Sequence, residues 1–203
     1  MIAAREVTQA QFELVMGYNP AFQQDSRRCP VESVSAHEAA AYCNGLSRAE
    51  GRPECYECTG ERATLRCKAR ATPRESCAGY RLPSEEEWEV AARGGTLTAV
   101  HSGTVQSCMS RDEEADEVGW YKSNSDGQPH PVGKKRPNAL GLYDMSGNVF
   151  EWTESSFPDG SRVLRGGSWY HNAEHLRVAG RFPVRAELAT SYAGLRCARS
   201  TDR

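Results

Sequence analysis

The sequence predicts an α+β fold, rich in loops, with about three helices followed by a half made of short strands. Helix-start signals occur only ahead of residue 95, where Thr8, Ser35 and Ser84 are each followed three positions later by a Gln or Glu that completes a capping box. Beyond that point short apolar runs alternate with Gly, Pro, Asn and Asp, which is typical of short strands and turns. The 18 glycines and 10 prolines also favour loops over a helical bundle.

Each predicted helix has a recognisable end. The first is expected to end at Met16, because Gly17 follows, and the second near residues 51–53, where Gly and Pro occur. The third should bury Trp88 and end before Gly94, with three glutamates in its first turn, where the helix dipole favours negative charge. Short strands are expected afterwards, at residues 118–121, 131–133, 148–152 and 162–165.

Length and charge exclude several classes of protein. At 203 residues the chain is expected to form a single domain, residues 1–203, that is large enough to bury a core. The formal net charge of −2 gives no basic footprint for nucleic acid or an anionic membrane. No apolar run approaches the roughly 20 residues that cross a bilayer, so no membrane span is predicted.

Half of the cysteines lie in one charged segment, and they are Cys55, Cys58, Cys67 and Cys77. A Cys-x2-Cys pair can begin a zinc site, but no second such pair follows. We therefore favour disulfides over zinc, with Cys58–Cys67 nested inside Cys55–Cys77 as one of the connectivities that the sequence allows. This cysteine usage favours an extracellular or periplasmic location, although no secretory signal is visible in the chain.

Four segments occur in an order that marks one family: Gly79–Arg93, Gly141–Trp152, Arg165–Trp169 and Gly194–Ala198. Through these segments the chain resembles the formylglycine-generating enzyme (sulfatase-modifying factor) family over nearly its whole length. The resemblance implies a C-type-lectin-like fold. It also implies a domain that is shortened at its N-terminus, because the family has a strand and a turn ahead of the position of Glu6.

The segment from Asp144 to Glu151 is a candidate metal site. Two carboxylates and an amide lie on a glycine-bearing turn, and hard oxygen donors on a bent loop suit Ca²⁺. In the family the matching segment holds a structural calcium ion. The resemblance assigns as ligands the side chains of Asp144 and Glu151 and the carbonyl groups of Gly147 and Val149. The alternative is a turn in which Asp144 and Asn148 cap local backbone and Glu151 meets an arginine.

The reaction centre of the family's enzymes is incomplete in this chain. Those enzymes oxidise a substrate cysteine with copper held by two cysteines after the Gly-Gly-Ser motif, yet no cysteine occurs between Cys108 and Cys197. Ser168 matches an active-site serine of the family, and His171 stands near the positions of the copper ligands. An imidazole does not replace a pair of soft thiolates, so copper is not expected, and Ser168 and His171 are the catalytic candidates. His171 and His175 are interpreted as surface histidines in preference to a metal-binding pair.

The segment from Tyr170 to Tyr192 corresponds to the pocket face of the family, where enzymes bind peptide and where some phage and bacterial relatives use retroelements to diversify a protein-binding surface. We therefore expect a noncatalytic module that binds a protein or peptide through aromatic and adaptable polar residues. The predicted contact residues are Trp169, Tyr170, His171, Asn172, His175, Arg181 and Tyr192. The alternatives are a peptidyl-cysteine oxidase or a relative that uses another metal, a regulatory module of a longer protein, and an ordinary solvated loop.

Overall fold

The computed structural model describes residues 1–24, 26–70, 76–107 and 110–200, and it confirms the predicted α+β class. The helices are α1 (Gln9–Met16), α2 (Ala36–Ala49), α3 (Glu85–Arg93) and α4 (Glu113–Val118). The strands are β1 (Tyr56–Thr59), β2 (Arg66–Ala69), β3 (Tyr80–Arg81), β4 (Phe150–Ser156), β5 (Arg162–Arg165), β6 (Phe182–Val184), β7 (Ala193–Gly194) and β8 (Ala198–Arg199). Short 3₁₀ turns lie at Arg62–Thr64 and Ala173–Leu176.

The first three helices begin where the capping signals predict. The side chains of Thr8, Ser35 and Ser84 each accept a hydrogen bond from the backbone N–H three residues on. The side chain of the Gln or Glu at that position in turn accepts a hydrogen bond from the backbone N–H of the capping residue. Helices α1 and α3 end, as predicted, at glycines in the left-handed conformation, with φ of 78° at Gly17 and 54° at Gly94. No helix in the described part of the chain has the length and hydropathy that a bilayer crossing requires.

Two of the four predicted strands are wrong. The run at 118–121 begins inside α4, because Asp112 accepts a hydrogen bond from the N–H of Ala115 and starts a helix that buries Ala115 and Val118. Residues 131–133 form a turn, in which the N–H of Gly133 donates to Oδ2 of Asp144 at 2.6 Å. The predicted strands at 148–152 and 162–165 correspond to β4 and β5.

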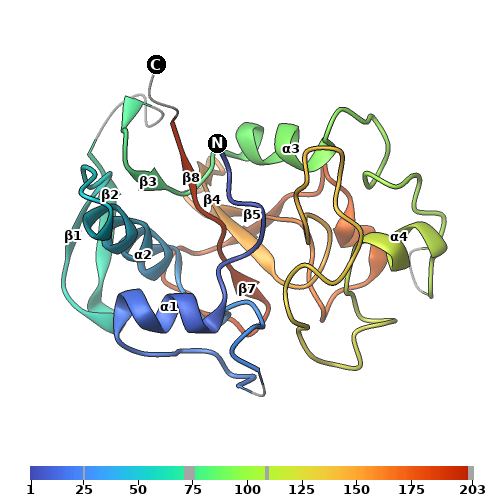
Figure 1. Ribbon diagram of the computed structural model, residues 1–203, viewed down its shortest axis with the longest axis horizontal. Coiled ribbons are helices and arrows are strands. Elements are labelled where there is room, and N and C mark those ends of the chain that lie inside the picture. Colours follow the sequence, from blue (N-terminus) through green and yellow to red (C-terminus); the bar gives the residue numbers. More distant parts are fainter. Residues whose placement is uncertain (25, 71–75, 108–109, 201–203) are drawn as a thin grey trace.

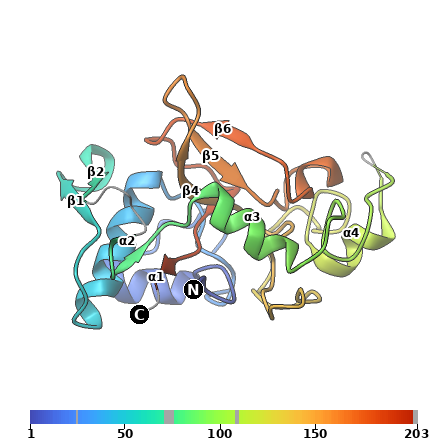
Figure 2. The same ribbon diagram turned by 90° about the horizontal axis from the view of Figure 1, so that it is seen from above.

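The central sheet has the strand order β6-β5-β4-β7 and lies between two halves of the fold (Figures 1 and 2). Helices α1 and α2 and the hairpin β1–β2 lie at one end, and α4 with the loops at residues 95–107 and 119–145 lies at the other. The core on the α2 side buries Phe12, Tyr42, Phe150 and Trp152. Because β4 pairs in parallel with β7, the C-terminal part of the chain lies beside the start of β4.

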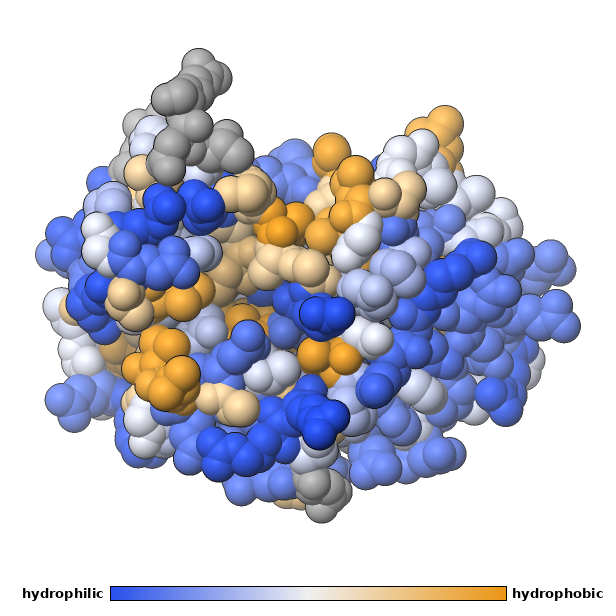
Figure 3. Space-filling model, viewed as in Figure 1, coloured by the Kyte–Doolittle hydropathy of each residue, from blue (hydrophilic) through white to orange (hydrophobic). Residues whose placement is uncertain are grey.

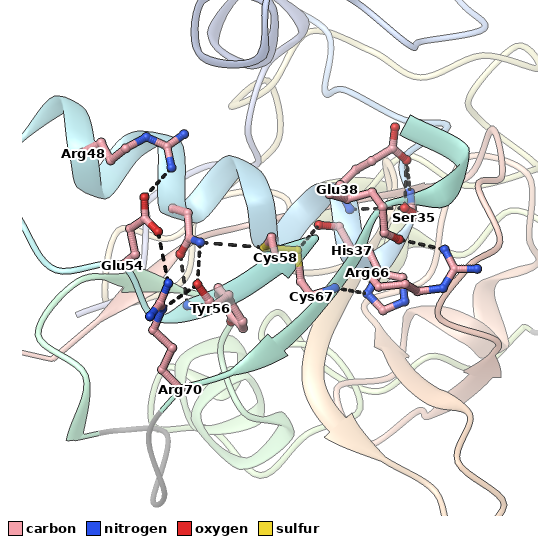
Figure 4. Close-up of a disulfide and its surroundings, with 12 residues drawn as sticks. Ser35, His37, Glu38, Arg48, Glu54, Tyr56, Cys58, Arg66, Cys67 and Arg70 are labelled. Carbon is pink, nitrogen blue, oxygen red and sulfur yellow. Dashed lines mark hydrogen bonds and ion pairs between the residues drawn. A yellow bond between two sulfur atoms is a disulfide. The ribbon is translucent and has the colours of Figure 1, made fainter. Parts of the chain in front are cut away.

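The cysteine-rich segment forms the hairpin β1–β2, and it is closed by the disulfides Cys55–Cys77 and Cys58–Cys67. The predicted disulfides and their nested pairing are therefore confirmed, and these sulfurs are not available as zinc ligands. Figure 4 shows the inner disulfide beside α2. Asn44 of α2 holds the hairpin through the backbone of Tyr56. Its Nδ2 donates to the carbonyl of Tyr56 at 2.9 Å, and its Oδ1 accepts a hydrogen bond from the N–H of Tyr56 at 3.1 Å. The hairpin is thus fixed to the helix at the end of the molecule away from α4.

Candidate functional site

The candidate site is built on the turn that follows β5. Gly166 and Gly167 have φ values of 95° and 80°, in the left-handed region that favours glycine. A Cβ atom on Gly167 would lie 2.8 Å from the carbonyl oxygen of His175, so a side chain there would clash with the segment that folds back. The N–H of Trp169 donates to the carbonyl of Asn148 at 2.8 Å. The two glycines therefore let residues 168–176 return to the start of β4.

His171 lies at the centre of a group of rings that we call the ring cluster, and the distances between ring centroids are 4.9 Å to Tyr192, 5.0 Å to Phe150, 5.0 Å to His175, 5.5 Å to Tyr170 and 5.6 Å to Phe182. All five contacts are edge-to-face, the arrangement that aromatic quadrupoles favour. Phe150 at the base is buried, whereas Tyr170 is 59 % exposed. The ring cluster therefore extends from the core to the surface.

Ser168 fixes the orientation of His171. Its Oγ lies 2.7 Å from Nδ1 of His171 and accepts a hydrogen bond from the N–H of Tyr170 at 3.3 Å. Ser168 is 0 % exposed, so in this arrangement its hydroxyl cannot meet a substrate. Burial, followed by His175 and Lys122, lowers the pKa of His171 to about 4. The ring of His171 is therefore neutral near pH 7.

The other predicted contact residues lie around the ring cluster in different roles. Trp169 is largely buried and donates from Nε1 to the carbonyl of Ser191 at 2.9 Å, so it supports the segment that carries Tyr192. Asn172 is the N-cap residue of the 3₁₀ turn Ala173–Leu176. Arg181 pairs with Glu85 of α3 at 2.6 Å and stacks on the ring of Phe157, 4.5 Å from its centroid. Of the seven predicted residues, the structure thus joins the two tyrosines and two histidines in one cluster.

Two members of the ring cluster, Phe150 and Phe182, are absent from the predicted contact residues. Each begins a strand in the structure. The sequence pattern predicts a strand at 148–152, which includes Phe150, and none at Phe182. Their rings stack with centroids 5.1 Å apart, although they are far apart in the sequence. Only the pairing of β4 with β5, and of β5 with β6, brings them together.

The histidine pair has no third metal ligand among the residues that the structure describes. Nε2 of His175 lies 3.6 Å from Glu174, but no group of three or more His, Cys, Asp or Glu side chains there is placed to hold a metal ion. Protein zinc sites use at least three such ligands. We derive no metal chemistry from this pair.

The predicted calcium segment lies within a carboxylate cluster, which consists of Glu6, Asp144 and Glu151 around Arg196. Both oxygens of Glu151 accept hydrogen bonds from Arg196, at 2.8–3.0 Å, and Oε2 also accepts one from Nε1 of Trp88 at 2.6 Å. This contact with an arginine is the one expected from the alternative to calcium. Oδ1 of Asp144, in contrast, is buried and has no hydrogen-bond partner among the described residues.

If its three carboxyl groups were all ionised, the carboxylate cluster would carry excess negative charge over the single guanidinium. Burial raises the pKa of Glu6 well above its ordinary value of 4.5, and Asp144 and Glu151 raise it further. Burial also raises the pKa of Asp144. Three carboxyl groups around one guanidinium would be neutralised by a bound cation or by protonation. Asp144 therefore fits a calcium ligand, whereas Glu151 would share its oxygens with Arg196, and the calcium site stays a prediction.

The order of the helices and strands and the match to solved structures define a formylglycine-generating-enzyme-like fold. The chain belongs to the family described as the sulfatase-modifying factor enzyme 1-like domain, whose sequence pattern matches residues 1–201. The resemblance stated from the sequence is therefore confirmed.

Similar proteins include both whole-chain and partial matches. The solved structure of Treponema denticola variable protein 1 has a TM-score of 0.80 and 31 % identity, and the match covers 95 % of this chain and 81 % of that one. Chaperone protein LppX of Paenibacillus barcinonensis is 33 % identical, over 89 % of this chain and 74 % of LppX. The inactive C-alpha-formylglycine-generating enzyme 2 of Mus musculus is 37 % identical, but the chain spans only 44 % of its length.

Proposed function

We propose that this domain is a noncatalytic module that binds a protein or peptide through the face from Tyr170 to Tyr192. The carrying observation is the ring cluster, in which the rings of Phe150, Tyr170 and Tyr192 surround His171 and Tyr170 is exposed. Rigid aromatic side chains supply large contact areas at low entropic cost, and tyrosine is enriched among the residues that dominate binding energy.

The chemistry of the site favours binding over oxidation. Oxidising a substrate cysteine with dioxygen requires a metal that activates oxygen and binds the thiolate. The residues after the Gly-Gly-Ser turn offer imidazoles in place of the thiolates that suit copper. The buried position of Ser168 suits a residue that orients His171. The names of two relatives, one called inactive and one called a chaperone, agree with a noncatalytic role.

A displayed library of random peptides, selected on the purified protein, tests this proposal. Selected peptides should bind the Tyr170→Ala and Tyr192→Ala variants at least about tenfold more weakly, because each change removes a ring worth roughly 1.4 kcal/mol or more at an interface. Phe22→Ala is the matched control, since Phe22 is 76 % exposed and lies outside the ring cluster. Peptides that bind all three variants as well as the wild type would refute the proposed face.

A direct assay separates the binding module from an oxidase. The protein is loaded with copper and incubated in air with a Cys-x-Pro-x-Arg peptide, and mass spectrometry follows conversion of the cysteine to an aldehyde. An unchanged peptide is expected. Turnover would identify the domain as a peptidyl-cysteine oxidase with a copper site of different ligands.

We also propose that the carboxylate cluster binds a structural calcium ion, with Asp144, the carbonyls of Gly147 and Val149, and Glu151 as the ligands that the chain offers. The buried, unpartnered Oδ1 of Asp144 supports this assignment. Chelation with EDTA should then lower the melting temperature of the wild type and leave that of Asp144→Ala unchanged, because alanine removes the ligand oxygen. A wild-type melting temperature that EDTA does not alter would remove calcium from the site.

A further inference from the structure

A small hollow with a charged lining lies where the hairpin β1–β2 meets the start of α2. Its volume is about 260 Å³, and the charged or titratable side chains that line it are those of His37, Glu38, Arg62, Arg66 and Glu187. It differs from the hollow of about 700 Å³ beside residues 1–8, around which apolar surface gathers in Figure 3. The lining of the smaller hollow suits a polar, charged ligand.

Two arginines are held at this hollow by contacts that leave their charge uncompensated. The guanidinium carbon of Arg62 lies 4.3 Å from the centroid of the Tyr18 ring. Nη1 of Arg66 donates to the carbonyl groups of Leu65 at 2.7 Å and Ala63 at 3.3 Å. Neither arginine has an ion-pair partner in the part of the chain that the structure describes. Arg66 can therefore offer its other N–H groups to a carboxylate or phosphate in a bidentate contact.

His37 adds a further donor to the hollow. Its Nδ1 accepts a hydrogen bond from the N–H of Cys67 at 3.1 Å, so the neutral ring carries its hydrogen on Nε2. Burial lowers the pKa of His37 and the charge of Arg66 lowers it further, which keeps the ring neutral near pH 7. Figure 4 shows the imidazole, from α2, next to the side chain of Arg66, from β2.

The two carboxylates at the hollow differ in their bonding. Glu38 is engaged in the helix cap, because its carboxylate accepts hydrogen bonds from the N–H and hydroxyl of Ser35, at 2.9 and 2.8 Å, and from the hydroxyl of Tyr18 at 2.7 Å. The side chain of Glu187 is 51 % exposed, and its Oε1 lies 3.9 Å from Nε2 of His37, too far for a hydrogen bond. An oxyanion that bonds to Nε2 would therefore displace only a loosely held carboxylate.

The hollow borders the face that carries the ring cluster. Glu187, which lines the hollow, belongs to the segment from Tyr170 to Tyr192. The carbonyl of Thr190, two residues before Tyr192, accepts a hydrogen bond at 2.9 Å from the N–H of Ser33, which also lines the hollow. A peptide that lies on the ring of Tyr192 thus passes close to the hollow.

We propose that this hollow binds an oxyanion-bearing side chain, a carboxylate or a phosphate group, of the peptide that contacts the ring cluster. Arg66 supplies the bidentate contact, Nε2 of His37 donates a hydrogen bond, and Arg62 adds positive charge. The proposal rests on the proposed binding function and deepens it, because it assigns an acidic residue to the ligand.

Peptides selected on the wild-type protein test this preference. We expect an Asp or Glu in them whose change to Asn or Gln weakens binding about tenfold on the wild type and less than about twofold on Arg66→Gln. Arg111→Gln is the matched control and should keep the full effect, since Arg111 is an exposed arginine beside α4, at the other end of the molecule. Selected peptides without an acidic residue, or an amide change with the same effect on the wild type and Arg66→Gln, would overturn the proposal.

Two further changes refine the peptide measurement. Glu187→Gln should strengthen the binding of acidic peptides about twofold to fivefold, because it removes a competing carboxylate; unchanged or weaker binding would contradict the displacement of Glu187. Phosphoserine in place of the acidic residue distinguishes the two sources of the oxyanion. Tighter binding would identify a phosphate, and weaker binding a carboxylate.

Acetate and inorganic phosphate, titrated by NMR at constant ionic strength, test the hollow without any peptide. Either ion should give saturable shifts of the His37 ring and Cys67 amide signals that are absent in Arg66→Gln. Such shifts without any selected peptide would keep the oxyanion site and count against the binding face. Peptides that need the ring cluster but show no preference for acidic residues would keep the face and overturn the oxyanion site. If no peptide is selected, the absence of a saturable shift with either ion overturns it as well.

Discussion

Replacing Glu151 with Gln tests the buried ion pair that supports the site. Glu151 and Arg196 are each at most 1 % exposed, and the carboxylate accepts three hydrogen bonds from Arg196 and one from Trp88. A glutamine would direct an NH₂ group at one of these donors and would leave the guanidinium without its main counter-charge. Breaking a buried pair in this way typically costs about 3–5 kcal/mol. Because Glu6 and Asp144 also interact favourably with Arg196, we expect a loss near the lower value, about 3 kcal/mol.

Urea unfolding followed by circular dichroism measures this loss directly. Glu13→Gln is the matched control, since its ion pair with Arg27 is solvent-exposed and should contribute less than about 1 kcal/mol. The two proteins should share one denaturant slope, so the difference appears in the midpoint. A loss below about 1 kcal/mol for Glu151→Gln would refute the reasoning, because it would mean that Glu6 and Asp144 suffice to hold Arg196.

The other predictions concern pH and the hairpin. The imidazole of His171 should titrate near pH 4 by NMR, and its contribution to stability should be present above pH 6.5 and lost as the pH falls through about 4, because its folded pKa is lowered; a midpoint near 6.5 would contradict its burial in the ring cluster. Burial raises the pKa of Glu6 in the folded state, so its contribution to stability is present below pH 4.5 and is lost as the pH rises. The free energy of unfolding of Glu6→Gln should therefore fall less than that of the wild type as the pH rises above 4.5. The double variant Cys58→Ala/Cys67→Ala opens a bridge of sequence separation 9 and should lose about 3 kcal/mol in urea unfolding. A loss near zero would show that the outer disulfide Cys55–Cys77 and Asn44 suffice to hold the hairpin.

Local signals predicted the elements that depend on a few neighbouring residues. The capping residues Thr8, Ser35 and Ser84 act on backbone groups three positions away, so the starts of α1, α2 and α3 could be read from the sequence. Helix α4 was missed because its cap, Asp112, is not followed by a Gln or Glu at the capping-box position, and the apolar run after it resembles a strand. Local pattern is weakest where one short run suits both kinds of element.

The residues of the candidate site also divide into those that the sequence predicted and those that it did not. Tyr170, His171, His175 and Tyr192 could be predicted as one face because they lie on a segment that a family motif marks. Phe150 and Phe182 could not, because apolar strand residues look alike until pairing decides which of them meet. The pairing also determines which of these rings are buried and which are exposed.

The sequence by itself determined the family, the loop-rich α+β class, the first three helices, and the absence of a cysteine between Cys108 and Cys197. Only the tertiary structure decided the ring cluster, the arrangement of Glu6 with Asp144 and Glu151, and the hollow that His37 and Arg66 line. The physical reason is the range of the interactions. Capping and turn chemistry act over a few residues, whereas burial and side-chain contact depend on how distant segments pack, which the local pattern of residues does not encode.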